Sequence, residues 1–310
     1  LMKIKKPDFW DDKRGIIAIS LFPISFLLQL ILKFKKIFSK QISFKIPVVC
    51  VGNIYLGGTG KTPLSIMLAE EFKKKGRKPA IIKKYYSEHI DEHHLINNYV
   101  DCLFMDKRRT RAIEKAQKEK YDIAILDDGF QDYSVKKNLN IICFNSKQLV
   151  GNNMTLPSGP LREKLSGLRE AQIILINGNK NEIFKKKILS ISNNIKIFYS
   201  KYLATNIEEF KNKELFAFAG IGNPENFFDI LNYNNLEVKK KVKFSDHYQF
   251  NKNEVKKMID YSLKNNLELI TTEKDYLRIK DCGFKNIKFL KIKLEILKKE
   301  KLIQEILRYS

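Results

Sequence analysis

The chain has 310 residues, enough to bury a substantial core, and 44% of them are hydrophobic. That apolar content excludes wholesale disorder. Lys and Arg outnumber Asp and Glu by 58 to 35, and the resulting formal charge of +23 favours anionic partners: nucleic acid, phosphorylated substrates or an anionic membrane surface.

A strongly apolar, uncharged run lies near the start of the chain. Residues 16–32 read IIAISLFPISFLLQLIL, with Pro23 in the middle and basic residues on both sides. As a helix the run would extend roughly 26 Å, slightly less than the ~20 residues of a spanning helix would reach. Phe9 and Trp10 precede it and suit the boundary between lipid and water.

Four interpretations of this run are open. A signal peptide would need a small-residue cleavage site after the run, and none follows. A full membrane span would be short, with both flanks positive. A buried helix of the main domain is the structural alternative. We favour a helix that lies in the inner leaflet, so we expect an N-terminal membrane-associated helix within residues 1–40.

From residue 46 onward, short apolar runs alternate with amphipathic stretches. This pattern predicts an α/β fold of the P-loop NTPase type, with a mostly parallel sheet and helices on both faces. The expected strands are residues 46–51, 79–82, 101–105, 122–126, 139–144 and 172–176. The expected helices include residues 61–75 and 108–120.

A second α/β run follows an extended stretch near residues 194–203. Its expected strands are residues 214–219, a strand ending near 244, 267–271 and 287–292. Its expected helices are residues 224–231, 252–264 and a terminal helix. We therefore expect a P-loop core over residues 41–205 and a smaller C-terminal α/β domain over residues 206–310.

The four cysteines are far apart and form no Cys-x-x-Cys pair. They are Cys50, Cys102, Cys143 and Cys282. This spacing indicates neither a disulfide framework nor a zinc site. We expect buried, reduced thiols, as in a reducing cytosol.

The most specific motif is the glycine-rich segment after the first core strand. It reads Gly57-Gly58-Thr59-Gly60-Lys61-Thr62. Glycines let backbone N–H groups converge on phosphate oxygens, and the following helix adds its positive dipole end. We expect Lys61 to reach the β- and γ-phosphates of ATP and the Thr62 hydroxyl to bind Mg²⁺. The strict pattern has glycine at position 55, where this chain has Tyr55; the alternative is a structural glycine turn.

An acidic pair ends the fourth expected strand, in the sequence IAILDDG over residues 123–129. An acid at the carboxyl end of a strand suits a Mg²⁺ site, because ligands bind at this edge of open α/β sheets. Asp-Asp-Gly is also a turn signal. Next to the phosphate loop, Asp127 and Asp128 are predicted to take part in the metal site.

The second domain contains the segment FSDHY, with His247, over residues 244–248. The other three histidines lie around Asp91 and Glu92. A single histidine is more often structural, and an Asp-Glu pair is more often a solvated turn. These residues gain significance from a family resemblance.

Together the motifs resemble those of the tetraacyldisaccharide 4′-kinase family, the lipid A 4′-kinases of Gram-negative bacteria. The resemblance extends from Phe9-Trp10 to residues 271–275. It rests on GNIYLGGTGKTP (52–63), DDGFQ (127–131), LPSGPLRE (156–163), FAGIGNPENFF (218–228), FSDHYQF (244–250) and TTEKD (271–275). It implies ATP- and Mg²⁺-dependent phosphorylation of the 4′-hydroxyl of a tetraacyl glucosamine disaccharide 1-phosphate, at the cytoplasmic face of the inner membrane.

The resemblance also implies roles for particular residues. Asp91 would accept the proton of the hydroxyl, and His247 would orient Asp91. Arg162 would neutralise the transferred phosphoryl group, and Glu163 would join Thr62 and Asp127 around Mg²⁺. A surface ion pair is the structural alternative for Arg162 and Glu163.

The sequence departs from the family pattern in three places. Lys83-Lys84-Tyr85-Tyr86 stands where an Arg-Gly-Tyr stretch is usual. Asp132 stands where histidine normally follows DDGFQ. The usual Gly-Asp-Glu-Pro around the base reads Ile90-Asp91-Glu92-His93.

Another function class would use the same loop and the same basic, apolar helix. A membrane-associated P-loop ATPase switch of the partitioning or targeting kind would hydrolyse ATP to change partners, but it would have no use for the motif around His247. A nucleic-acid partner is not expected, because no zinc spacing, RNP motif or aromatic-interleaved basic stretch accompanies the charge. We also infer no obligate protein partner.

Overall fold

The computed structural model describes residues 7–12, 15–86, 90–280, 283–284 and 286–309, with the backbone alone for residues 90 and 91. The described residues form two compact units. The core unit comprises those within Lys6–Tyr85, Val100–Lys201 and Glu295–Ser310. The second unit comprises those within Tyr86–Tyr99 and Tyr202–Leu294. The expected domain boundaries at residues 40 and 205 stay a prediction.

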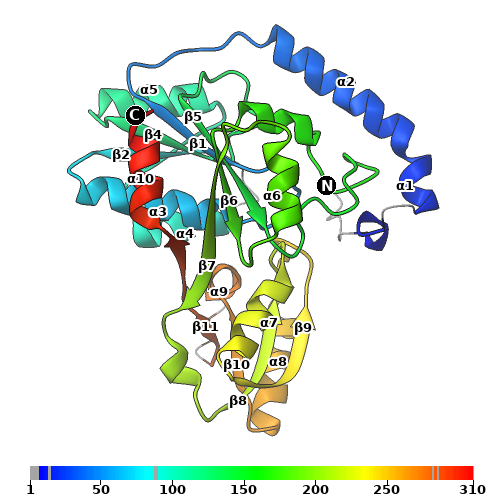
Figure 1. The fold of residues 1–310 in the computed structure, drawn as a ribbon. Coiled ribbons are helices and arrows are strands. Elements are labelled where there is room, and N and C mark those ends of the chain that lie inside the picture. The colour runs from blue at the N-terminus through cyan, green and yellow to red at the C-terminus, as the bar shows by residue number, and fades with distance from the viewer. Residues whose placement is uncertain (1–6, 13–14, 87–89, 281–282, 285, 310) are drawn as a thin grey trace. The chain divides into compact units, whose positions relative to one another are not determined.

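The core unit is built on an eight-stranded sheet in the order β12-β7-β6-β5-β1-β4-β2-β3 (Figure 1). Its strands are β1 (Val48–Gly52), β2 (Pro79–Lys84), β3 (Leu103–Asp106), β4 (Ile123–Asp127), β5 (Leu139–Asn145), β6 (Ile173–Asn177), β7 (Lys196–Ala204) and β12 (Ile292–Leu297). Every pairing from β3 to β7 is parallel. The predicted mostly parallel sheet is confirmed, and β1 lies at its centre between β4 and β5.

Two strands differ from the sequence-based expectation. The stretch expected to be merely extended near residues 194–203 is β7, which pairs with β6. Its side chains are mostly half-buried or exposed, so it lacks the apolar signal of the central strands. The single strand expected at residues 287–292 is two strands in different sheets, β11 (Lys288–Leu290) and β12.

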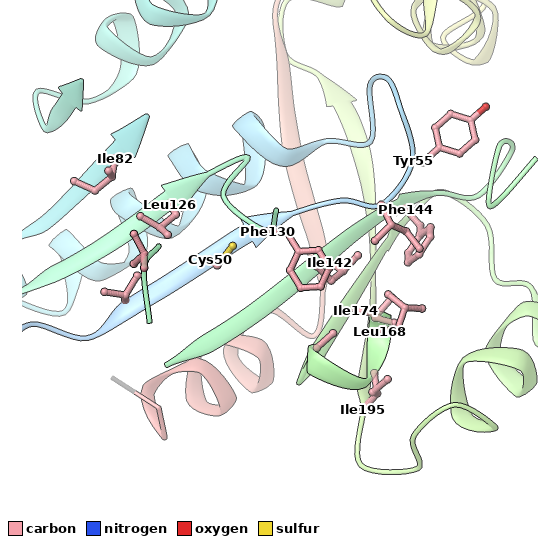
Figure 2. Close-up of a cluster of buried hydrophobic side chains, with 14 of the residues drawn as sticks. Cys50, Tyr55, Ile82, Leu126, Phe130, Ile142, Phe144, Leu168, Ile174 and Ile195 are labelled. Atoms are coloured by element: carbon pink, nitrogen blue, oxygen red, sulfur yellow. The ribbon is translucent and has the colours of Figure 1, made fainter. Parts of the chain in front are cut away.

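Helices cover both faces of the core sheet, as predicted. They include α3 (Lys61–Lys74), α5 (Arg109–Lys118), α6 (Glu182–Leu189) and α10 (Lys299–Leu307). Figure 2 shows the cluster on one face, to which Cys50, Leu126 and Ile142 contribute together with apolar side chains of α5 and α6. Because side chains alternate along a strand, the remaining strand residues face the other side. Helix α3 contacts β1, β2 and β4 but adds no described side chain to this cluster, so it covers the opposite face.

Two α-helices in the described part of the N-terminal region precede the sheet, where the sequence predicted one. Helix α1 (Ile16–Ser20) ends at Leu21, and α2 (Phe22–Phe38) follows directly. Pro23 lies in the first turn of α2, where its missing N–H removes no helical hydrogen bond. Of the helices within the described residues, none is both long and apolar enough to cross a membrane.

The second unit contains a four-stranded parallel sheet in the order β11-β10-β8-β9. Its other strands are β8 (Glu214–Ala219), β9 (Glu237–Lys243) and β10 (Glu268–Thr272). Its helices are α4 (Ile90–Tyr99), α7 (Pro224–Tyr233), α8 (Lys252–Lys264) and α9 (Glu273–Ile279). One cluster packs α7 against one face of β8, and another packs α8 against the opposite face. This arrangement confirms the predicted smaller α/β element.

The described cysteines are buried and have free thiols, as expected. They are Cys50, Cys102 and Cys143, whereas Cys282 lies outside the described residues. Burial raises the pKa of Cys50 to about 11 and that of Cys143 to about 12. These two thiols therefore stay protonated near neutral pH and suit a structural role.

Replacing Gly52 tests the packing where β1 enters the phosphate loop. A Cβ atom at Gly52 would lie 2.4 Å from the Cβ atom of Phe130, so one backbone segment must move. We expect Gly52→Ala to lower the free energy of unfolding by about 1–3 kcal/mol, measured by chemical denaturation. The control, Lys186→Ala on the exposed side of α6, should change it by less than about 0.5 kcal/mol. Equal stabilities of the two variants would contradict the tight packing.

Candidate active site

The phosphate loop joins β1 to α3 at the carboxyl edge of the core sheet. Gly57 and Gly60 have φ angles of 127° and 94°, which glycine adopts without strain. Gly60 is the N-cap of α3, and no side chain caps this helix end. The first-turn N–H groups, which begin with Lys61, are therefore available to an anion. The Asn53 amide donates to the carbonyl of Gly57 (3.3 Å) and to the Thr59 hydroxyl (3.0 Å), and so ties the loop together.

The structure explains the tyrosine at the position where the strict pattern has glycine. Tyr55 is 1% exposed, and its backbone forms an antiparallel bridge with Leu161. Backbone hydrogen bonds of 2.7 and 2.8 Å join residues 54–56 to residues 160–162 on either side of this bridge. Extended backbone of this kind accepts a large side chain. The conformational freedom of glycine is used at positions 57 and 60 instead.

Asp127 ends β4 beside the first turn of α3, and its side chain is fully buried. Its Oδ2 accepts hydrogen bonds from the Thr62 hydroxyl (3.0 Å) and the Lys83 ammonium (2.6 Å), and its Oδ1 accepts one from Ser65 (3.2 Å). The structure thus brings together Thr62 and Asp127, two residues predicted for the metal site. Lys83 was not predicted for the site. The sequence feature that could have indicated its role is a lysine at the end of an apolar strand. Such a lysine is buried, and a buried ammonium needs an anionic partner.

Asp128 follows β4 and is surrounded by cations. The Arg162 Nη1 lies 2.9 and 3.1 Å from its two carboxylate oxygens, and the Lys61 Nζ lies 3.7 Å from its Oδ1. Burial raises the pKa of Asp128, but the positive charges around it outweigh burial and hold the pKa well below its usual range. The cations responsible are Lys61, Arg162, Lys83 and Arg109. Three predicted site residues, Lys61, Asp128 and Arg162, therefore lie together.

Arg109, at the start of α5, holds the turn after β4 and was also missed by sequence reasoning. Its Nη2 donates to the carbonyl oxygens of Asp128 (2.7 Å) and Asp127 (3.3 Å), and its Nη1 donates to Asp132 (3.1 Å). Burial raises the pKa of Asp132, but hydrogen bonds from Ser134 and the charge of Arg109 bring it below its ordinary value. The aspartate at the usual histidine position is thus the anionic partner of a buried arginine.

Glu163 is held by Gln131 at the edge of this group. The Gln131 amide donates to Glu163 (2.7 Å) and to the backbone carbonyl of Asn53 (2.9 Å), and its oxygen accepts from Arg162 (3.4 Å). Burial raises the pKa of Glu163, with the bond from Gln131 acting in the opposite direction. The structure does not place Glu163 in hydrogen-bond contact with Thr62.

No group of three or more His, Cys, Asp or Glu side chains within the described residues is arranged to hold a metal ion by itself. The predicted metal residues Asp127, Asp128 and Glu163 are instead hydrogen-bonded to three different side chains, which are Lys83, Arg162 and Gln131 in that order. Mg²⁺ is commonly bound by one or two protein oxygens together with phosphate oxygens and water. The hydroxyl of Thr62 and the carboxylate of Asp127 are oxygens of this type.

A second group of charged side chains lies in the second unit. Glu92 on α4 accepts a hydrogen bond from Lys274 on α9 (2.7 Å), and its Oε1 lies 4.0 Å from the His247 Nε2. Asp91 precedes Glu92 in α4, but its side chain lies outside the described residues. His247 has a φ of 53°, in the left-handed region that is uncommon for residues other than glycine.

Asp275 anchors the base of this second group. It is fully buried and accepts hydrogen bonds from the Gly220 N–H (3.0 Å), the Thr272 hydroxyl (2.7 Å) and the Arg278 Nη1 (2.7 Å). Burial raises the pKa of Asp275, and the charge of Arg278 and the hydrogen bonds offset only part of this effect. Glu92, Lys274, Asp275 and Arg278 were not among the predicted site residues.

The Arg278 guanidinium also contacts His247, with its Nη2 3.4 Å from Nδ1. Because a guanidinium can only donate, this contact uses the lone pair of Nδ1. The ring proton of a neutral His247 is then on Nε2, which lies 4.0 Å from a carboxylate oxygen of Glu92 and 3.9 Å from one of Asp246.

A sequence model of a family described as tetraacyldisaccharide-1-P 4′-kinase (LpxK) matches residues 17–310. The tetraacyldisaccharide 4′-kinase of Pelagibacter ubique is 39% identical and covers 100% of this chain and 99% of its own length. That of Rickettsia bellii is 32% identical, with coverage of 91% and 92%. The crystal structure of LpxK from Aquifex aeolicus in complex with ATP has a TM-score of 0.73 at 25% identity, over 95% of this chain and 99% of that chain.

The buried ion pair of Lys83 and Asp127 predicts a large cost when one partner is removed. Lys83→Met should lower the free energy of unfolding by about 3–5 kcal/mol, because Asp127 would keep a buried charge without its cation. The Lys83→Met/Asp127→Asn double variant should cost less than the sum of the two single variants. Chemical denaturation measures all three, and exposed Lys78→Met, just before β2, is the control. Additive single and double variants would contradict the coupling.

The low pKa of Asp128 predicts a defined pH dependence of stability. Because the folded chain binds this proton less tightly than the unfolded chain, the stabilisation is complete above the ordinary value of 3.8 and is lost as the pH falls through the lower folded value. The difference in unfolding free energy between wild type and Asp128→Asn should be constant near neutral pH and shrink below about pH 4. Exposed Asp260→Asn is the control. A difference that already disappears near neutral pH would contradict the assignment.

Proposed function

Because the chain belongs to the tetraacyldisaccharide-1-P 4′-kinase family, we propose that it transfers the γ-phosphoryl group of ATP to the 4′-hydroxyl of a tetraacyl glucosamine disaccharide 1-phosphate. The names of its relatives specify this class of acceptor. The observation that carries the proposal is the cation-rich edge of the core sheet, where Lys61 and Thr62 lie beside Asp127 and Asp128.

The phosphate loop fits a nucleoside triphosphate. Gly57 and Gly60 carry no Cβ atom, so the loop backbone can approach phosphate oxygens closely. Thr59 and Gly58 supply further N–H groups of this loop. Lys61 would lie along the β- and γ-phosphates and neutralise the charge that develops on the leaving oxygen.

The oxygens beside the loop fit Mg²⁺. The Thr62 hydroxyl and the Asp127 carboxylate are 3.0 Å apart, and we assign both as direct ligands. Asp128 and Glu163 would hold water molecules of the ion. The bound ion would supply positive charge to the β- and γ-phosphate oxygens. Lys83 would balance the charge of Asp127 throughout.

Arg162 would contact the transferred phosphoryl group. In this structure its guanidinium is paired with Asp128, which also lies 3.7 Å from the Lys61 Nζ. The γ-phosphate of ATP carries more negative charge than one carboxylate and would attract both cations more strongly than Asp128 does. Arg162 would then neutralise the three equatorial oxygens during transfer.

Asp91 and His247 would handle the proton. The 4′-oxygen forms a bond to the γ-phosphorus, the bond between that phosphorus and the ADP oxygen breaks, and the hydroxyl proton passes to the Asp91 carboxylate. His247, with its proton on Nε2, would donate to that carboxylate and fix its direction. The Glu92–Lys274 pair beside His247 would keep this part of α4 in register with α9.

The outer side of α1 and α2 fits a lipid bilayer. Its exposed large apolar side chains are Ile16, Ile17, Ile19, Phe22, Ile24, Phe26, Leu27, Leu28, Ile31, Phe34, Ile37 and Phe38. Such a continuous apolar surface is unfavourable in water. Lys33 and Lys35 lie in the last turns of α2 and Lys40 follows the helix, and these side chains suit anionic headgroups. The acceptor is itself a membrane lipid, so we place this surface in the cytoplasmic leaflet of the inner membrane.

Two variants test the proton-handling residues. Asp91→Ala and His247→Ala should each lower the kcat of lipid phosphorylation by about 100-fold or more, because general base catalysis is lost, while ATP affinity stays close to that of wild type. Lys61→Ala should lower both the kcat of lipid phosphorylation and the affinity for ATP. The assay is incubation with labelled ATP and the tetraacyl disaccharide 1-phosphate in detergent, followed by chromatography of the lipid, with exposed Asp260→Ala as control.

Full activity of either variant would remove that residue from the mechanism. ATP hydrolysis by wild type without any labelled lipid would instead favour the ATPase switch.

A further inference from the structure

The inner side of α2 contacts the segment that leads to Arg162. We call residues 151–162 the connecting segment. The Ser25 hydroxyl lies 2.9 Å from the Thr155 carbonyl oxygen and 2.7 Å from the Ser158 hydroxyl, and it accepts the Ser158 N–H at 3.0 Å. One turn further along α2, the Gln29 amide donates to the backbone carbonyl of Arg162 at 3.2 Å. The helix is therefore bonded to both the middle and the end of the segment.

Trp10 contacts the start and the middle of the same segment. Its indole N–H donates to the carbonyl of Pro157 (3.0 Å), and its own carbonyl accepts the N–H of Asn152 (2.8 Å). A Cβ atom at Gly151 would lie 2.9 Å from the carbonyl oxygen of Trp10, so the two backbones are in close contact. The residues before and within the apolar helices thus contact the segment at several points.

The connecting segment continues directly into the phosphate site. Residues 160–162 form backbone hydrogen bonds with residues 54–56 of the phosphate loop. The Arg162 side chain contacts Asp128, which in turn lies beside Lys61. A single short segment therefore joins the apolar helix α2 to the cations of the site.

The positions of the polar residues in α2 indicate that these hydrogen bonds determine which side of the helix faces the protein. Ser25 and Gln29 are the uncharged polar residues of this helix, and both are directed toward the protein. Ser25 is 1% exposed, whereas Phe26 next to it is 50% exposed. A buried hydroxyl or amide is unfavourable without a partner, so the bonds to the segment hold this side of α2 inward.

We infer that Gln29 is a positioning residue for Arg162, so that the helix assigned to the lipid surface also fixes the backbone of the arginine assigned to the phosphoryl group. This inference rests on the proposed function. Gln29 contacts the carbonyl of Arg162, and its role is to hold that backbone at one place beside the phosphate loop. Its loss should therefore affect transfer more than ATP binding.

The test compares two variants of Gln29 with a neighbour on the outer side. Gln29→Ala removes the side chain, and Gln29→Glu keeps its shape but removes the donor. In detergent micelles, where access to the lipid does not depend on vesicle binding, both should lower kcat about tenfold and leave the KM for ATP unchanged. Phe26→Ala should weaken partitioning onto anionic phospholipid vesicles, which the Gln29 variants should not affect.

A second measurement does not depend on activity. Hydrogen exchange of the backbone amides in residues 155–162 should be faster in both Gln29 variants than in wild type and Phe26→Ala. An unchanged kcat in Gln29→Glu overturns the inference, as does exchange in this segment that is the same in all four proteins. If wild type phosphorylates no lipid, the proposed function fails, and the exchange rates alone decide whether Gln29 holds the segment.

Discussion

The structure of the core unit depends on the charge balance at the carboxyl edge of its sheet. Asp127 is completely buried, and Asp128 follows it in a turn. Such carboxylates are stable only with partners, and Lys61, Lys83 and Arg162 supply them. A fourth cation, Arg109, donates to the backbone carbonyls of the same two aspartates. Cations drawn together in this way also suit a polyphosphate, so the requirement for stability and the requirement for nucleotide binding are met by the same residues.

The connecting segment gives the apolar N-terminal helices a place in this arrangement. Helix α2 is bonded to the segment through Ser25 and Gln29, and the segment pairs with residues 54–56 of the phosphate loop. The tyrosine at position 55 belongs to this pairing. In the proposed function, one continuous structure therefore connects a surface suited to lipid with the group that transfers phosphate, which fits an enzyme of a family whose acceptor is itself a lipid.

The parts of the site that lie in contiguous sequence motifs could be predicted from the sequence. The phosphate loop, and Asp127 at the end of its strand, lie in contiguous motifs, so their contact followed from the fold class. Lys83 and Arg109 reach the same place from separate elements, and only the tertiary structure brings them there. Gln131 lies in the DDGFQ motif, but its contact with Glu163 also depends on the tertiary structure. Strand β7 was expected only as an extended stretch, because its half-exposed side chains give little apolar signal. The resemblance, rather than any local pattern, directed attention to His247.

A single turnover with γ-labelled ATP, Mg²⁺ and the tetraacyl disaccharide 1-phosphate would show where the phosphoryl group goes. We expect the label to appear in the lipid, on its 4′-oxygen, at the rate at which ATP is consumed. Label released only as inorganic phosphate, or ATP left intact on the enzyme, would contradict the claim that the cations at the sheet edge direct the phosphoryl group to a sugar hydroxyl.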